Sequence, residues 1–253
     1  MNFRDIVKST SKVAIAPLVN DPVFAATINE AIDLLFNAIP VRKKDDILTV
    51  IGDRLAFLEE NHVDLKELEK DEVFQSVLYT SIPILMKTHQ KEKLEAVFNS
   101  VTNVPLTNID ENYRFIFLNL IDKYNEWHLR ILRALGEPEL HLDLPLEGNP
   151  LAYLESNFIL LSEQSRVYTL RNSCLDITDV TRERFLLLLF PELRKDKVFF
   201  NIILNDLISD QLINEGLLRS IPTHHLIHPC TTEFGKSFIE SIQDPDRIID
   251  SIK

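Results

Sequence analysis

The sequence predicts a mainly α-helical protein, in which an N-terminal helical bundle is followed by a small C-terminal module with a short β-hairpin. The chain of 253 residues contains only five glycines against twelve prolines, whereas a doubly wound α/β sheet needs many glycine-rich turns. Hydrophobic residues make up 45% of the chain and recur mostly at helical spacing, so the chain can bury a sizeable helical core.

The N-terminal arm contains an apolar patch at residues 13–19 that is interrupted by Pro17. This patch has about half the length that a membrane-spanning helix needs, so we expect neither a signal peptide nor a membrane anchor. A helix is then predicted to start at Asp21 and Pro22, because aspartate is a good N-cap and proline suits the first helical position. Pro40 is predicted to end it.

Four further helices are predicted before residue 102. Residues 42–61 place an apolar stripe on one face of a helix, and the short connection before them favours an antiparallel hairpin with the first helix. The stripe contains Ile47, Leu48, Ile51, Leu55 and Leu58. The acidic run 59–72 is interpreted as a short helix with a solvated face. Helices over 71–87, with a kink at Pro83, and over 90–101 are predicted to follow.

Residues 110–138 carry the strongest helix signal in the chain. Asp110 is a predicted N-cap, while Gly136 and Pro138 are predicted to stop the helix. Apolar residues occur on nearly every side, so a single central and buried helix is expected. Trp127 and His128 lie within it, and a lone histidine in such a setting is usually a hydrogen-bonded core residue; neither residue is given a chemical role.

The proline-rich residues 141–150 are the best candidate for a linker. We therefore predict a helical bundle domain over 1–140 and a second domain over 151–253. Cys174 and Cys230 lie far apart in the sequence, and both are expected to be reduced thiols in a cytosolic protein rather than a disulfide.

In the second domain, residues 149–158 are interpreted as a helix or helical turn, and 177–193 as a helix capped by Thr178 or Asp179. A third helix is predicted from residue 194 to a stop at 214–216. Its apolar residues form a wide stripe of Val198, Phe199, Ile202, Ile203, Leu207, Ile208 and Leu212.

Two short phrases after these helices resemble the end of a winged-helix domain. Gly216, Leu217 and Leu218 match the phrase that often finishes the third helix of such a domain, and residues 232–235, Thr-Glu-Phe-Gly, match the phrase that opens its last helix. The resemblance covers roughly residues 151–243. It implies that a β-hairpin wing lies between the two phrases, and that DNA binding is a natural function to test.

The intervening segment contains His224, His225, His228 and Cys230, which raises the question of a metal site. Side chains alternate along a wing strand at about 3.3 Å per residue, so His224 and Cys230 would lie too far apart to share one ion. His228 and Cys230 could chelate together, but a structural zinc needs four ligands and no CxxC or HxxxH partner is nearby. We therefore predict no metal and no other cofactor.

The charge of the chain disfavours nucleic acid as a ligand. The formal net charge is −12, and residues 174–243 carry seven basic against ten acidic residues. The predicted third helix has bases only near its start, at Arg194, Lys195 and Lys197. Asp206 and Asp210, further along, would face phosphates or bases unfavourably.

The sequence contains no P-loop, GxGxxG, GxSxG or HExxH motif, so no catalytic residue is assigned. We predict a non-enzymatic, cytoplasmic, bacterial-type adaptor that binds a protein partner, with a homodimer as one candidate assembly, and that does not bind membranes. The alternative is a transcriptional regulator that binds DNA as a dimer through its winged helix, with Arg194, Lys195 and Lys197 on the phosphates.

Overall fold

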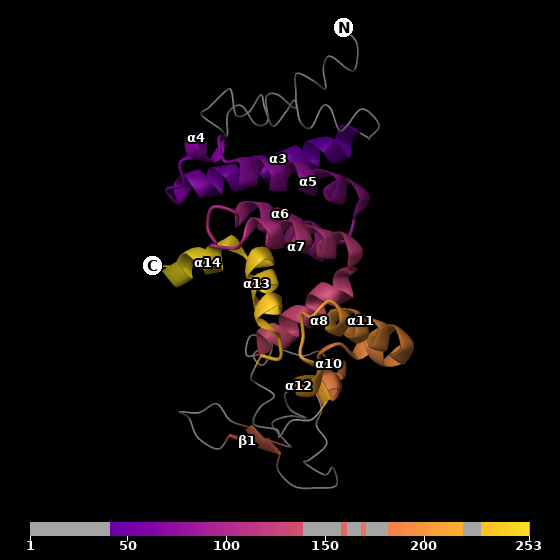
Figure 1. Cartoon of the computed structure of the whole chain (residues 1–253). Helices are drawn as coiled ribbons and strands as arrows, with labels where there is room; N and C mark the ends of the chain where they lie inside the picture. The colour runs from indigo at the N-terminus through magenta and orange to yellow at the C-terminus, as the bar shows by residue number, and fades with distance from the viewer. Residues whose placement is uncertain (1–40, 139–157, 161–167, 171–181, 220–228, 253) are drawn as a thin grey trace. The chain divides into compact units, whose positions relative to one another are not determined.

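The computed structural model describes residues 41–138, 158–160, 168–170, 182–219 and 229–252 (Figure 1). This part of the chain is mainly α-helical, as predicted. The N-terminal arm, the predicted first helix and the predicted linker 141–150 lie outside it. Among the described residues, no helix combines the length and the apolarity that are required to cross a membrane.

The chain forms two compact units. The first unit ends at Glu126 and resumes at Glu240, while the second runs from Trp127 to Ile239. In sequence, the second unit is therefore inserted between two parts of the first.

The helices of the first unit are α3 (Val41–Glu60), α4 (Leu65–Leu68), α5 (Glu72–Lys87), α6 (Lys91–Thr102), α7 (Glu111–Lys123) and α14 (Pro245–Ile252). Helices α3, α4, α5 and α6 are close to those that were predicted, whereas α14 was not predicted. Asp64, Asp71 and Asp110 cap α4, α5 and α7, each with a side-chain oxygen that accepts a backbone N–H of the first turn. Pro83 lies inside α5.

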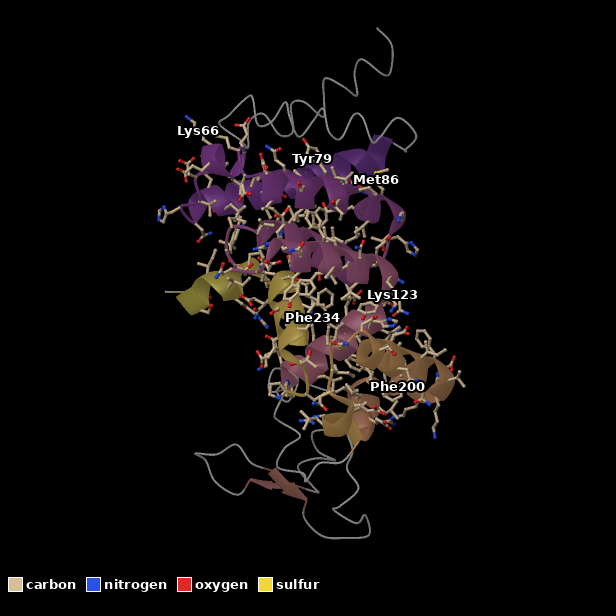
Figure 2. All side chains as sticks on the ribbon, in the orientation of Figure 1. Lys66, Tyr79, Met86, Lys123, Phe200 and Phe234 are labelled. Atoms are coloured by element: carbon tan, nitrogen blue, oxygen red, sulfur yellow. The ribbon has the colours of Figure 1, made fainter. Side chains whose placement is uncertain are left out.

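The predicted apolar stripe of α3 forms part of the core of this unit. Ile47, Ile51, Leu55 and Leu58 are all buried. The core is completed by residues of the other helices, among them Phe74, Val77, Ile82, Leu85, Ala96, Val97, Phe117, Leu118 and Ile121. Lys66 and Tyr79, by contrast, have exposed side chains (Figure 2).

The single long helix that was predicted over residues 110–136 is wrong, because the chain forms two helices there. The first is α7, and the second is α8 (Glu126–Gly136). Tyr124 lies between them with an extended backbone, at ψ 155°, and its side chain is buried. The apolar residues, which would surround a single helix, form two separate stripes. The stripe of α7 packs within the first unit, and the stripe of α8 packs within the second. Phe117, Leu118 and Ile121 belong to α7, and Leu129, Leu132 and Leu135 to α8.

Asn99 of α6 and Asn103, the C-cap of α6, bind the C-terminal end of α13 (Glu233–Ile242), the part of that helix that belongs to the first unit. Asn103 Nδ2 donates to the carbonyls of Glu240, Ser241 and Gln243 at 3.3, 3.1 and 2.8 Å. Asn99, one turn earlier on α6, donates to the Ile242 carbonyl at 3.1 Å. Both asparagines are buried. They therefore supply hydrogen-bond donors to carbonyls at the C-terminal end of α13, where the helix itself has no further N–H groups to offer.

The second unit consists of short elements. They are α8, β1 (Phe158–Leu160), β2 (Tyr168–Leu170), α10 (Arg182–Leu189), the 3₁₀ helix η3 (Pro191–Lys195), α11 (Lys197–Ser209), α12 (Glu215–Arg219) and the first part of α13. Strands β1 and β2 pair antiparallel, with Phe158 opposite Leu170. Phe158, the last residue of the helix or helical turn expected over 149–158, is thus in a strand.

Helix α11 ends at Ser209, earlier than the stop that was predicted at residues 214–216. Gln211 adopts a left-handed backbone with φ 59°, which ends an α-helix in the way that glycine usually does. The backbone N–H groups of Gln211 and Leu212 donate back to the carbonyls of Ile208 and Leu207, at 2.9 and 3.0 Å. Gly216 is not a stop but a residue of α12, and Asn214 Oδ1 accepts its backbone N–H at 2.9 Å.

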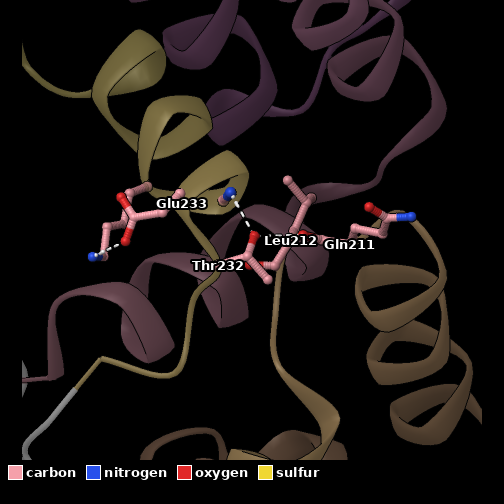
Figure 3. Close-up of polar contacts among 6 residues, drawn as sticks. Gln211, Leu212, Thr232 and Glu233 are labelled. Carbon is pink, nitrogen blue, oxygen red and sulfur yellow. Dashed lines mark hydrogen bonds and ion pairs between the residues drawn. The ribbon is translucent and has the colours of Figure 1, made fainter.

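The start of α13 packs closely against the chain that follows α11 (Figure 3). Ile213 and Thr231 form an antiparallel bridge, and the Thr232 N–H donates to the Leu212 carbonyl at 3.0 Å. The Thr232 hydroxyl donates to the Gln211 carbonyl and accepts the Gly235 N–H at 2.9 Å. A Cβ atom on Gly235 would lie 2.0 Å from the Leu212 carbonyl oxygen. This contact explains why glycine occupies the fourth position of the Thr-Glu-Phe-Gly phrase.

Candidate functional site

The predicted basic cluster lies where η3 meets α11. Arg194 and Lys195 end η3, Lys197 begins α11, and all three side chains are exposed. Arg194 Nε donates to the Leu187 carbonyl at 2.7 Å, which ties one of the three cations to its own unit. Asp196, between the lysines, caps α11 by accepting the Phe199 N–H at 2.9 Å. The cluster is therefore small, and an acidic residue interrupts it.

The wide apolar stripe that was predicted for α11 is divided between two sides of the helix. Ile203, Leu204 and Leu207 are buried with Phe200 (labelled in Figure 2), whereas Val198 and Ile202 are 71% and 50% exposed. Apart from Lys197 at the start of the helix, the exposed residues recur at helical spacing and form one surface, which we name the α11 face. It consists of Val198, Asn201, Ile202, Asn205 and Ser209. None of these side chains is charged.

A pocket of about 290 Å³ adjoins the α11 face. Its lining comes from α10, α11 and α12, and it shares two residues with the α11 face. The lining residues are Glu183, Asn201, Leu204, Asn205, Ile208 and Leu218. Glu183 is the only charged residue among them. In the described part of the chain, we find no hydrogen bond or ion pair made by the side chains of Glu183, Asn201 or Asn205.

Asp206 does not belong to the α11 face, although the sequence suggested that it would face a ligand. Its carboxylate lies 3.2 Å from Nε2 of His128 on α8, and the His128 side chain is buried. The expectation that His128 is a hydrogen-bonded core residue agrees with this contact. Trp127 packs against Phe190, and the Arg130 guanidinium lies 4.4 Å from the centroid of the Trp127 ring. These contacts join α8 to the segment that precedes η3.

Cys230, from the candidate metal-binding segment, is a core residue of the second unit. Its side chain is fully buried, and its backbone bonds to Leu135 and Asn214. Burial raises the pKa of the Cys230 thiol to about 11, although the charge of Arg182 acts in the opposite direction. Arg182 is also buried, and its guanidinium donates to the Leu217 carbonyl. The thiol is thus protonated and enclosed at neutral pH.

His224, His225 and His228 lie outside the described residues, so their arrangement with Cys230 remains a prediction. Across the ranges that the structure describes, no three His, Cys, Asp or Glu side chains gather into a group that could hold a metal ion.

The α11 face and its pocket were not predicted. The sequence contains Asn201 and Asn205 one turn apart and Val198 and Ile202 one turn apart, but nothing in this spacing tells which side of α11 is buried. Comparisons of the chain with protein-family models, with curated proteins and with solved structures found no match.

Proposed function

We propose that this protein is a non-enzymatic, cytoplasmic adaptor that binds another protein through the α11 face. The exposure of Val198 and Ile202, at 71% and 50%, carries this proposal. Val198 and Ile202 are two β-branched apolar side chains one turn apart, and Lys197 is the one charged side chain beside them on α11. They form a patch that a protein partner can desolvate at little electrostatic cost. The neighbouring asparagines supply hydrogen-bonding groups around it.

The same surface is less suited to DNA. A helix that lies in the major groove contacts phosphates and base edges through several basic and polar side chains. Lys197, at the first position of α11, is the one basic side chain that borders the α11 face, and Arg194 and Lys195 precede the helix in η3. The chain as a whole carries a formal net charge of −12. Both properties favour a protein partner over a nucleic acid.

We propose a winged-helix-like architecture for the C-terminal module, with a wing between the Gly-Leu-Leu phrase at 216–218, which lies in α12, and the Thr-Glu-Phe-Gly phrase at 232–235. The bridge between Ile213 and Thr231 and the hydrogen bond from the Asn214 N–H to the Cys230 carbonyl support it, because they bring the two ends of that segment together. The Thr-Glu-Phe-Gly phrase at the start of α13 supports it as well.

The proposed function is tested by photo-crosslinking and affinity purification of the tagged full-length chain from its native cells. We expect the wild-type chain to retain a defined protein that the double variant V198D/I202D loses, because two carboxylates on the α11 face oppose desolvation. I116D is the matched control, since Ile116 on α7 is a comparably exposed apolar residue, at 42%, in the first unit. A partner that all three chains retain would refute a role of the α11 face. A second copy of the chain as the crosslinked protein would make the assembly a homodimer.

The second candidate function is that of a DNA-binding regulator, and the exposure of Arg194, Lys195 and Lys197 at the start of α11 is the observation that favours it. We expect weak binding to duplex DNA at physiological salt, because contacts with roughly three phosphates release few counterions. A mobility-shift titration at that salt tests this expectation. Sub-micromolar, sequence-selective binding that K195A/K197A abolishes would replace the adaptor proposal.

A further inference from the structure

The lining of the pocket beside the α11 face has one charged side chain, the Glu183 carboxylate. Glu183 comes from the first turn of α10, while Asn201 and Asn205 come from successive turns of α11. The carboxylate supplies two acceptor oxygens and each amide supplies one more. In the described residues, these side chains make no hydrogen bond to another part of the chain. Their acceptors are thus available to a ligand.

The size and the position of the pocket restrict the ligand. Pockets that enclose drug-sized molecules usually measure about 300–1,000 Å³, so an open pocket of about 290 Å³ suits a group of side-chain size. Leu204, Ile208 and Leu218 supply apolar lining that can contact a methylene chain. The pocket shares Asn201 and Asn205 with the α11 face. A partner segment that places a side chain in the pocket can therefore also contact Val198 and Ile202.

We propose that the pocket is the site where an arginine side chain of the protein partner docks, while apolar residues of the partner cover Val198 and Ile202. The planar guanidinium can bind the Glu183 carboxylate through two parallel hydrogen bonds and donate its other N–H groups to the amide oxygens. The Glu183 carboxylate, the one charged group in the lining of the pocket, is complementary to the charge of a guanidinium. Lys197, one turn before Asn201, places a positive charge at the end of this surface and fits an acidic or neutral residue of the partner.

This inference rests on the proposed protein-binding function, and it adds the chemistry of the partner. A peptide array provides the probe: each peptide has a central arginine flanked by combinations of leucine, isoleucine, serine and glutamate. Matched arrays carry citrulline or lysine in its place. Citrulline retains the shape of arginine without its charge. Binding of the labelled full-length chain is quantified by fluorescence polarisation with the best peptides.

We expect arginine peptides with leucine or isoleucine neighbours to bind, and their citrulline forms to bind about tenfold or more weakly, which corresponds to about 1.4 kcal/mol. E183Q should cause a similar loss, while E192Q should cause none, because Glu192 is an exposed carboxylate outside the pocket. Equal binding of the citrulline peptides, unchanged binding by E183Q, or no binding by any peptide would overturn the inference. Competition by free arginine at the concentration of the peptide would assign the pocket to a small molecule and would also overturn it.

The two proposals can fail separately. If V198D/I202D loses the native partner and E183Q retains it, the α11 face binds protein and the arginine site is refuted. If none of the variants loses the partner, the proposed function itself is refuted.

Discussion

The two ends of α13 are held in different ways. At the N-terminal end, in the second unit, Thr232 accepts the N–H of Gly235, three residues later in the sequence, and Gly235 lies against the backbone of Leu212. At the C-terminal end, in the first unit, the side chains of Asn99 and Asn103 donate to the last carbonyls. Asn103 and Gln243 are 140 residues apart in the sequence.

This difference separates local from tertiary capping. A threonine that precedes a helix and bonds a backbone N–H within its first turn is a short-range pattern, so a reader of the sequence can recognise it. Carbonyls at the C-terminus of a buried helix need donors as well, but a helix that is distant in the sequence can supply them. The sequence around the C-terminus then contains no pattern that predicts the cap. Substitutions at each end of α13 and in its surroundings test this difference.

Gly235→Ala should have the largest effect. Its Cβ would lie 2.0 Å from a backbone oxygen, so either α13 or the Leu212 segment must move, and we expect a loss of about 3 kcal/mol or more of unfolding free energy. Chemical denaturation followed by circular dichroism measures the loss. Gly216→Ala is the control, since its Cβ meets only the end of the Asn214 side chain, at 3.3 Å, and it should change stability by less than about 1 kcal/mol. Equal stability of both variants would show that the approach of Gly235 to Leu212 is not a constraint.

Asn103→Ala should destabilise the first unit by about 2–3 kcal/mol, because it removes a buried amide that donates to three carbonyls at the end of α13. Hydrogen exchange should accelerate most in the last turn of α13, whose carbonyls lose the Asn103 donor. Asn119→Ala provides the control, because Asn119 is exposed on α7 and should be nearly neutral. Unchanged exchange at residues 240–243 would contradict the proposed capping by α6.

The buried thiol of Cys230 should make the stability of the second unit sensitive to alkaline pH. Its pKa rises from the usual 9.0 to about 11 on folding, so the unfolded chain releases this proton first as pH increases. The stabilising contribution is complete below pH 9 and is lost between pH 9 and about 11, on the order of 2 kcal/mol. Denaturation of the wild type and of Cys230→Ala over this pH range measures the difference. Parallel pH profiles would contradict it, as would rapid alkylation of Cys230 in the folded protein at pH 7.

Thr232→Ala should cost about 1 kcal/mol, the usual value of an N-cap, because the Gly235 N–H loses its acceptor. Thr232→Ser retains the hydroxyl and should recover most of this loss. Thermal unfolding of the two variants provides the comparison. If serine and alanine destabilise equally, the threonine methyl group rather than the hydroxyl is what matters at this end of the helix.

The helical class, most helices of the first unit and the N-cap of α7 could be predicted from the sequence alone. Each depends on interactions within a few residues: the apolar spacing of Ile47, Ile51 and Leu55, or an aspartate before a first turn. The motif at Thr232 and Gly235 was also recognisable, although its reason, the approach to Leu212, was not.

Tertiary structure decided where helices break and which faces remain exposed. The apolar residues at 110–136 indicated one buried helix. The chain instead forms two helices, α7 and α8, with the buried Tyr124 between them. Likewise, Ile202 and Ile203 are adjacent and chemically identical, yet only Ile203 is buried. Hydrophobic burial depends on what lies opposite a side chain, and the elements around α11 come from separate parts of the chain. For this reason the α11 face, its pocket and the pairing of Asp206 with His128 exist only in the folded protein.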